Sequence, residues 1–175
     1  NIAMAIKREP RLRQWIREIT IMGGSTTTGN FTPAAEFNIA ADIEAASVVF
    51  ESGIPFRMVG YNITRQTGFD SNDINRLRAT GTHACSAIAD LMQFYLNRQG
   101  DMYGLTIAPM HDVCAIIPYV RPDLITFLHT SARIELTGTY TRGMTVCDVR
   151  HPKGSAEPSL RNRTEPNAHV AVAAK

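Results

Sequence analysis

The sequence predicts an α/β fold, with a Rossmann-like, open and mostly parallel sheet flanked by helices and a small antiparallel portion near the C-terminus. Three observations predict it. Short apolar runs at residues 19–22 and 56–60 are separated by a polar loop and then by helical periodicity over 40–51, which is the strand, loop, helix, strand order of parallel sheets. After residue 126 the periodicity changes to alternation, which predicts strands at a sheet edge or in a small antiparallel unit.

In the first part of the chain, residues 2–8 and 11–18 are expected to form two helices separated by Pro10, because proline lacks the amide hydrogen that a helix interior needs. Residues 19–22 are expected to form a buried strand, after which the chain turns at two glycines. The helix over 40–51 ends before a Gly and Pro pair. Its apolar face consists of small and branched side chains at helical spacing: Ala41, Ala45, Val48 and Val49.

In the second part, capping side chains at 71–73 predict a helix near 73–79, and a longer helix is expected over 83–96. Residues 97–108 are expected to form a Gly-containing loop, and a helix is expected over 111–119. Two or three strands then follow from the alternating apolar residues Ile134, Leu136, Met144, Val146, Val149, Val170 and Val172. The stretch 152–167 is rich in proline, serine and charge, and is expected to be an exposed loop.

The composition indicates one globular domain over residues 1–175, since 44% hydrophobic and 19% charged residues are enough to bury a core. A net charge of +2 is too small to favour nucleic acid or a membrane surface as a partner. Three widely spaced cysteines predict neither a disulfide framework nor a zinc site. With no signal-peptide pattern at its start, the chain is expected to be cytoplasmic. It begins without Met inside an expected helix, so an upstream segment is expected to be missing.

A polar cluster over residues 30–38 is expected at the carboxyl end of the first strand, where parallel sheets bind ligands. Glu36 offers a charged acceptor, and Asn30 and Asn38 offer amides that both donate and accept. This suits the hydroxyl groups of a ribose or a similar polyol. The alternative is a loop whose Asn and Glu side chains satisfy their own backbone, and the pattern leaves both open.

A second polar pair, His111 and Asp112, lies at an expected helix start. In one interpretation Asp112 caps the helix or interacts with its positive dipole end, and His111 is a partly buried polar residue. In the other, Asp112 ligates a hard cation and His111 gives a proton to a leaving group. Both interpretations remain open from these two residues alone.

Three further side chains precede His111 and offer contacts to a heterocycle, by ring contact or amide hydrogen bonding: Tyr95, Gln99 and Tyr103. The structural alternative is core packing for Tyr95. For Gln99 and Tyr103, which are expected in the loop over 97–108, it is surface exposure.

Several motifs in order along the chain resemble the inosine-uridine nucleoside hydrolases. They are Met22-Gly23-Gly24, Gly29-Asn30, the run TPAAEFNI at 32–39, Pro109-Met110-His111-Asp112 with Cys114, and Thr141-Arg142-Gly143-Met144-Thr145-Val146 with Asp148. The resemblance covers nearly the whole chain. It implies hydrolysis of the N-glycosidic bond of ribonucleosides to free base and ribose, in a family that uses a calcium ion to hold the attacking water and the ribose hydroxyls.

The resemblance also implies roles for individual residues. His111 corresponds to the catalytic histidine beside the leaving base, and Asp112 to a calcium ligand. The remaining residues are implied in substrate binding: Met22, Asn30, Glu36, Phe37 and Asn38 around the ribose, and Tyr95, Gln99 and Tyr103 near the base. Gln99 and Tyr103 stand where pyrimidine-preferring members carry base-contacting residues, so uridine and cytidine are the expected substrates. Family members are commonly homodimers or homotetramers, and the same is expected by analogy.

The chain departs from the family pattern because it has no aspartate-rich DxDxxxDD segment, the source of most calcium ligands and of the base that activates water. We therefore expect it to be the C-terminal part of a nucleoside hydrolase domain. Alone it should bind calcium weakly and be inactive, since one carboxylate cannot replace the hydration of a divalent ion. The alternative function is a noncatalytic nucleoside- or ribose-binding module that lacks the metal segment.

Overall fold

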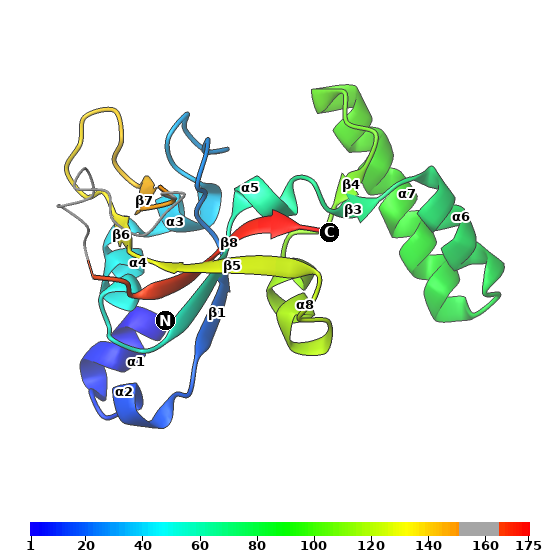
Figure 1. Cartoon of the computed structure of the whole chain (residues 1–175). Coiled ribbons are helices and arrows are strands. Elements are labelled where there is room, and N and C mark those ends of the chain that lie inside the picture. The colour runs from blue at the N-terminus through cyan, green and yellow to red at the C-terminus, as the bar shows by residue number, and fades with distance from the viewer. Residues whose placement is uncertain (151–164) are drawn as a thin grey trace.

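A four-stranded sheet forms the centre of the molecule in the computed structural model, which describes residues 1–150 and 165–175 (Figure 1). Its strand order is β1-β2-β8-β5. Strands β1 (Ile19–Met22), β2 (Phe56–Val59) and β8 (Ala168–Ala174) run parallel, and β5 (Ile125–Thr130) pairs antiparallel with β8. The prediction of an open, mostly parallel sheet flanked by helices is confirmed.

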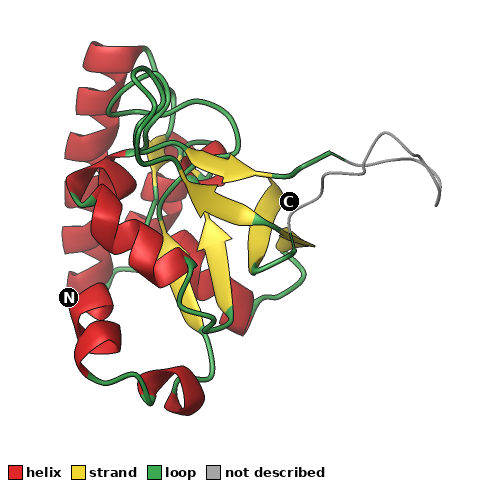
Figure 2. Cartoon of the chain, turned by 90° about the vertical axis from the view of Figure 1, so that its left-hand side faces the viewer, coloured by secondary structure: helices red, strands yellow, loops and turns green. Residues whose placement is uncertain are grey.

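Apolar side chains cover both faces of the sheet, because successive side chains of β2 point to opposite faces. Phe56 and Met58 point into one apolar cluster, which α4 (Ile43–Phe50) closes through Ile43 and Phe50. Val59 points into the cluster on the opposite face, which α8 (Val113–Val120) closes through Cys114. The helix α1 (Ile2–Arg8) packs on α4, and the N-terminal helices lie to one side of the strands (Figure 2). The sheet therefore has a core on each face, as expected for a doubly covered parallel sheet.

Several helix and strand boundaries differ from the prediction. The helix expected over 11–18 is only α2 (Leu12–Trp15). The helix expected over 40–51 is two helices, α3 (Phe37–Ala41) and α4, because the Asp42 carboxylate accepts a hydrogen bond from Ala45 N and starts a new helix. The buried residues of α4 are Ile43, Ser47 and Phe50, and not the predicted face of Ala41, Ala45, Val48 and Val49. The strand β1 is half-buried along its length and not buried as predicted.

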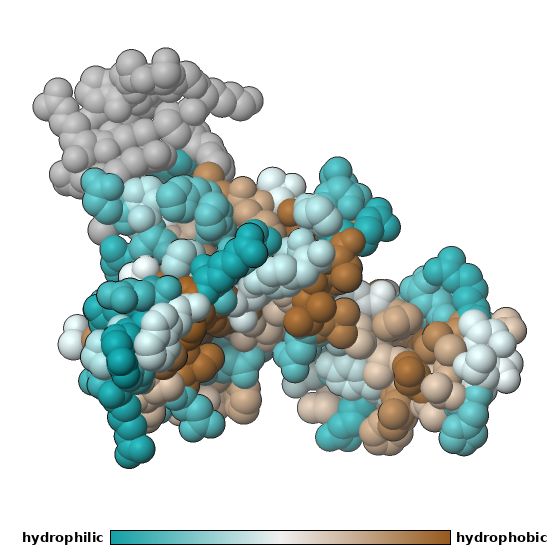
Figure 3. Space-filling model, turned by 90° about the horizontal axis from the view of Figure 1, so that it is seen from below, coloured by the Kyte–Doolittle hydropathy of each residue, from teal (hydrophilic) through white to brown (hydrophobic). Residues whose placement is uncertain are grey.

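A pair of helices, α6 (Ser71–Ala79) and α7 (His83–Tyr103), projects from the sheet as an arm (Figure 1). The two-stranded pair of β3 (Gly68–Phe69) and β4 (Ala108–Pro109) joins the arm to the rest of the chain. The helix α7 continues for 21 residues to a left-handed cap at Gly104, so the loop predicted over 97–108 is wrong for residues 97–103. Leu91 and Phe94 of α7 are exposed. Figure 3 shows apolar residues at the surface of the arm, in brown.

The remaining elements complete the connections. The short helix α5 (Tyr61–Thr64) follows β2, and β6 (Ala132–Ile134) pairs antiparallel with β7 (Thr145–Cys147), which confirms the small antiparallel unit. Leu136, Met144 and Val149, predicted in strands, lie outside them. The loop predicted over 152–167 lies mostly outside the described residues. No helix among the described residues is long and apolar enough to cross a membrane.

Gly24 at the end of β1 is expected to tolerate no side chain. Its φ is +72°, and a Cβ there would lie 2.6 Å from Thr145 Cγ2 and 3.0 Å from Met58 Sδ. Left-handed strain and overpacking together predict that Gly24→Ala lowers the free energy of unfolding by about 3 kcal/mol, measured by urea denaturation. The control is Gly53→Ala, at φ +78° with no atom within 4 Å of the added Cβ. It should cost only about 1 kcal/mol, and equal losses in the two variants would contradict the packing argument.

A pair of histidines predicts loss of stability in mild acid. His129 on β5 and His169 on β8 stack with ring centroids 4.7 Å apart. Burial lowers the pKa of His169, and the charges of His129 and Arg57 lower it further, while Glu18 opposes them. The unfolded chain then binds more protons than the folded chain, so the stability present above the unfolded pKa of about 6.5 is lost as the pH falls.

The check is urea unfolding of wild type and His169→Gln between about pH 5 and pH 8. The variant should show a shallower fall toward pH 5. Some slope should remain, because burial also lowers the pKa of His111. If wild type and variant show the same dependence of the free energy of unfolding on pH, the stacked histidine pair does not contribute to the loss of stability in acid.

Candidate functional site

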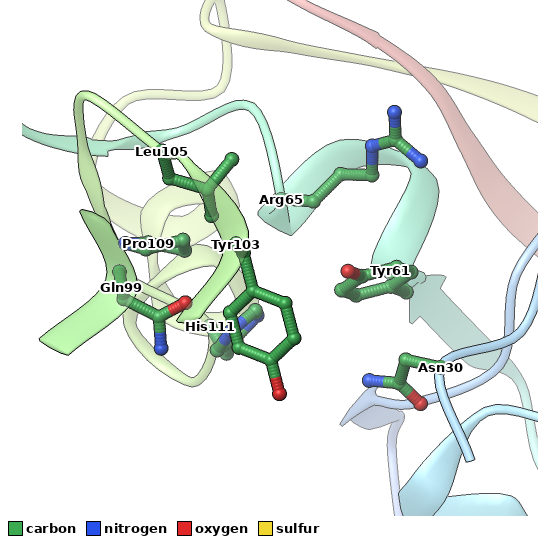
Figure 4. A pocket seen from close by; sticks show the side chains of 8 residues that line it. All are labelled: Asn30, Tyr61, Arg65, Gln99, Tyr103, Leu105, Pro109 and His111. Carbon is green, nitrogen blue, oxygen red and sulfur yellow. The ribbon is translucent and has the colours of Figure 1, made fainter. Parts of the chain in front are cut away.

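A cavity of about 510 Å³ lies between the arm and the carboxyl ends of β1 and β2. Figure 4 shows two groups of side chains facing each other across it. The group on one side consists of Gln99, Tyr103, Leu105, Pro109 and His111. The group on the other side consists of Asn30, Tyr61 and Arg65. The loop after β1, the helix α5, the helix α7 and the turn after β4 thus build one site, although they lie far apart in the sequence.

Four of the predicted site residues line this cavity together: Asn30, Gln99, Tyr103 and His111. Gln99 and Tyr103 are on the last turns of α7 and not on a loop, so the helix fixes their spacing. The side-chain nitrogen of Asn30 faces the cavity (Figure 4), while its Oδ1 accepts a hydrogen bond of 2.8 Å from Phe37 N. The structure therefore brings the polar cluster after β1 and the residues before α8 to a common site.

Glu36 lies behind the cavity wall and is 2% exposed. Its carboxylate accepts hydrogen bonds from the backbone amides of Gly24 at 2.9 Å, Asn38 at 3.0 Å and Ile39 at 3.3 Å. These contacts cap α3 and tie the loop to the end of β1. The geometry is that of the structural alternative, a side chain that satisfies nearby backbone. A contact between Glu36 and ribose remains a prediction.

Asn38, Met22 and Phe37 lie beside Glu36 but do not line the cavity. The Asn38 amide nitrogen donates to Met22 O at 3.1 Å and lies 3.1 Å from Met22 Sδ. Phe37 is 57% exposed and meets Phe31 edge to face at 5.9 Å. Of these three residues, Phe37 is joined to Asn30 through its backbone amide. A role of the three side chains toward the ribose stays a prediction.

His111 is half-buried at the base of the cavity, and two residues of α5 hold its ring. Its Nδ1 lies 2.8 Å from Thr64 Oγ1, and Tyr61 stacks on the ring with centroids 6.1 Å apart. Burial lowers the pKa of His111, while the charges of Asp112 and Glu36 act in the opposite direction.

Asp112 is the N-cap residue of α8, but its side chain makes no capping hydrogen bond. Its place at the positive end of the helix dipole, with His111 half-buried before it, still fits the structural alternative. A calcium ion needs six to eight oxygen ligands. Within residues 1–150 and 165–175 no group of three or more His, Cys, Asp or Glu side chains is placed to hold a metal ion. The side chains around Asp112 in the described residues therefore do not make up the ligand set that a calcium ion needs.

Tyr95, the remaining predicted base contact, does not line the cavity. It packs half-buried on the apolar cluster between α6 and α7, as the structural alternative proposed. Burial raises the pKa of its hydroxyl, and a hydrogen bond with Gln99 opposes that shift.

The sequence interpretation gave no site role to Leu105 and Pro109, which line the cavity, nor to Tyr61, Thr64 and Arg65. The last three follow β2 at its carboxyl end, where ligand-binding residues of parallel sheets are expected. The expectation that ligands bind at the carboxyl ends of parallel strands points to the loop after β1, and it points equally to the residues that follow Gly60 at the end of β2. The Arg65 guanidinium lies 5.9 Å from the Tyr61 ring centroid, so the two side chains form one wall of the cavity.

Comparisons with known proteins agree with this geometry. The family model described as inosine-uridine preferring nucleoside hydrolase matches residues 1–175. A pyrimidine-specific ribonucleoside hydrolase RihA from Citrobacter koseri is 40% identical over 173 residues, which is 98% of this chain and 53% of the relative. Another RihA, from Enterobacter sp., is 41% identical over 149 residues, covering 85% of this chain and 48% of the relative.

Solved structures give the same result. A purine-preferring ribonucleoside hydrolase from Gardnerella vaginalis superposes with a TM-score of 0.84 at 31% identity, over 99% of this chain and 52% of the other. A plant nucleoside hydrolase, PpNRh1, superposes with a TM-score of 0.83 at 26% identity, over 99% of this chain and 54% of the other. The chain spans about half the length of the curated relatives it matches.

Proposed function

The chain belongs to the inosine-uridine preferring nucleoside hydrolase family, and on that premise we propose that it supplies the ribose- and base-binding part of an enzyme that hydrolyses ribonucleosides to free base and ribose. One observation carries the proposal. Asn30, Gln99, Tyr103 and His111 come from three separate segments and line one cavity of about 510 Å³. The resemblance implies that these residues contact the nucleoside.

Pyrimidine nucleosides are the proposed substrates. Gln99 offers both a donor and an acceptor, which match the adjacent carbonyl and ring N–H of uracil or the amino group and ring nitrogen of cytosine. Tyr103 is 66% exposed at the cavity, so its ring is available to a base. The relatives named pyrimidine-specific support this preference. Among solved structures a relative is named purine-preferring, so a nucleoside panel has to decide between the two classes.

In this proposal the described residues bind the ribose and stabilise the leaving base. As the N-glycosidic bond breaks, positive charge develops on the ribose ring and negative charge on the departing base. His111 lines the cavity and donates a hydrogen bond or a proton to the base as that charge develops. Asn30 presents its amide nitrogen to the ribose, and the backbone network around Glu36 keeps its loop in place.

Calcium enters the proposal only for a protein that also carries the aspartate-rich segment of the family, with Asp112 as one ligand. When bound, the ion would supply the activated water. On these grounds residues 1–175 alone should be inactive, and the intact gene product should be active and calcium-dependent. Assembly as a homodimer or homotetramer is part of the same proposal.

The test is a panel of ribonucleosides assayed with the intact gene product, with and without a calcium chelator, beside purified residues 1–175 as the matched control. We expect hydrolysis of uridine and cytidine that the chelator removes, and none by the control. Hydrolysis by residues 1–175 at rates near those of the intact protein would refute the inactivity of the piece. If the intact protein binds uridine in calorimetry but hydrolyses no ribonucleoside, the noncatalytic binding module is the correct function.

A further inference from the structure

Thr64 is fully buried, with 0% exposure, at the last position of α5. Its hydroxyl Oγ1 lies 2.8 Å from Nδ1 of His111, a hydrogen-bond distance. A threonine in a helix often bonds its hydroxyl to the carbonyl one turn earlier. Here the carbonyl of Gly60 accepts the backbone amide of Thr64, and the hydroxyl bonds to the imidazole instead. The side chain of Thr64 is thus oriented toward the cavity histidine.

The direction of this hydrogen bond follows from burial. A hydroxyl has one proton, and leaving a buried donor unsatisfied costs about 1–3 kcal/mol. Among the described residues, His111 Nδ1 is the one partner of Thr64 Oγ1. Thr64 therefore donates, which requires that Nδ1 of the neutral ring carry no proton. The proton of the neutral imidazole must then be on Nε2.

The surroundings of the ring agree with this assignment. Nδ1 is occupied by Thr64, and no hydrogen bond joins Nε2 to any residue of 1–150 or 165–175. His111 lines the cavity, and Tyr61 stacks on the ring, which limits its rotation. Nε2 is consequently the ring nitrogen left for a ligand. A neutral ring held in this way presents an N–H donor to whatever the cavity binds.

We infer that Thr64 is a positioning residue that holds His111 in the Nε2–H tautomer, so that the ring donates a hydrogen bond to the pyrimidine carbonyl as negative charge develops on the leaving base. The inference deepens the proposed function and rests on it for the identity of the ligand. The tautomer itself rests on the contacts of Thr64 and His111 alone. Thr64 is not among the residues that the sequence motifs singled out.

The experiment is ¹⁵N NMR of the histidine side chains in ligand-free, labelled residues 1–175, at about pH 8.5, where neutral imidazole dominates. Wild type should show His111 with a proton on Nε2 and an unprotonated, hydrogen-bonded Nδ1. Thr64→Val keeps the shape and removes the hydroxyl, and should move the two nitrogen shifts toward those of a mixture of tautomers. Thr64→Ser should retain the wild-type shifts.

The matched control is Thr67→Val, which removes a nearby hydroxyl that contacts Cys114 Sγ and Thr64 O but not His111. It should leave the His111 nitrogen shifts unchanged. A proton on Nδ1 in the wild type overturns the inference, and this spectrum is decisive even if Thr64→Val fails to fold. Unchanged nitrogen shifts in a folded Thr64→Val protein overturn it as well.

In the intact gene product, Thr64→Val should lower kcat for uridine about 10–100-fold with KM little changed, and Thr64→Ser should restore it. The NMR result and the kinetic result separate the two claims. If His111 carries its proton on Nε2 but the intact protein hydrolyses no ribonucleoside, the proposed function is wrong and the assignment of Thr64 stands. If the intact protein is active but His111 carries its proton on Nδ1, the proposed function stands and the assignment of Thr64 is wrong.

Discussion

Replacing His111 by alanine is expected to lower kcat for uridine about 10²–10³-fold in the intact gene product, the usual effect of removing a hydrogen-bond donor that stabilises charge developing in the transition state. The imidazole lines the cavity and is held on one side by Thr64 and on the other by the Tyr61 ring. Alanine leaves the base without a donor when its charge develops. The affinity for uridine should change much less, because the lost interaction is strongest in the transition state.

The control for this variant is His83→Ala, at the first residue of α7 and at the far end of that helix from Gln99 and Tyr103. Steady-state assays of both variants, with circular dichroism to confirm folding, make the comparison. Activity of His111→Ala within a few-fold of the control would remove His111 from the chemistry of the site.

Replacing Glu36 by alanine is expected to lower the free energy of unfolding by about 3 kcal/mol, since hydrogen bonds to charged groups contribute about 1.5–3 kcal/mol each and leave buried donors behind when they are lost. The affected donors are the amides of Gly24, Asn38 and Ile39. Glu36→Gln keeps one acceptor oxygen and should cost less than Glu36→Ala. Urea unfolding of residues 1–175 measures both.

Glu44→Ala is the control for this prediction, because Glu44 makes a surface ion pair with Arg142 that should contribute at most about 1 kcal/mol. Equal losses in the Glu36 and Glu44 variants would contradict the role of the buried carboxylate in the loop. A large loss of uridine affinity in Glu36→Gln without a loss of stability would show instead that Glu36 contacts the ribose directly, the interpretation that the sequence left open.

The central part of the fold could be predicted because its signals are local. The strands β1 and β2 are mostly apolar segments of four residues, each followed by Gly, and the buried residues of α4 recur at helical spacing. The break at Asp42 was missed because one capping carboxylate interrupts a periodic pattern that otherwise continues. The length of α7 was missed because Gly100 and polar neighbours resemble a loop. The helix continues through this segment until Gly104, which adopts a left-handed conformation and donates its amide to Gly100 O.

The site could be predicted in part for the same reason. Asn30 and His111 lie in motifs that resemble a known family, and both line the cavity. Tyr61 and Thr64 belong to a four-residue helix with no pattern of its own, and their meaning comes from the position of His111, 47 residues after Thr64. The end of β2 points to this segment as a ligand-binding region, but the contacts of Tyr61 and Thr64 with His111 depend on tertiary structure and leave no local signal. The metal site could not be assembled from Asp112 alone.

The claim on which the account depends is that the polar loop after β1 and the imidazole before α8 bind the same nucleoside. Titration of labelled residues 1–175 with uridine, followed by NMR, tests it most directly. We expect the NMR signals of the Asn30 and Gln99 side-chain amides and of the His111 ring to shift together and to give one dissociation constant for uridine. Shifts confined to one of these segments, or different dissociation constants for Asn30 and His111, would contradict it.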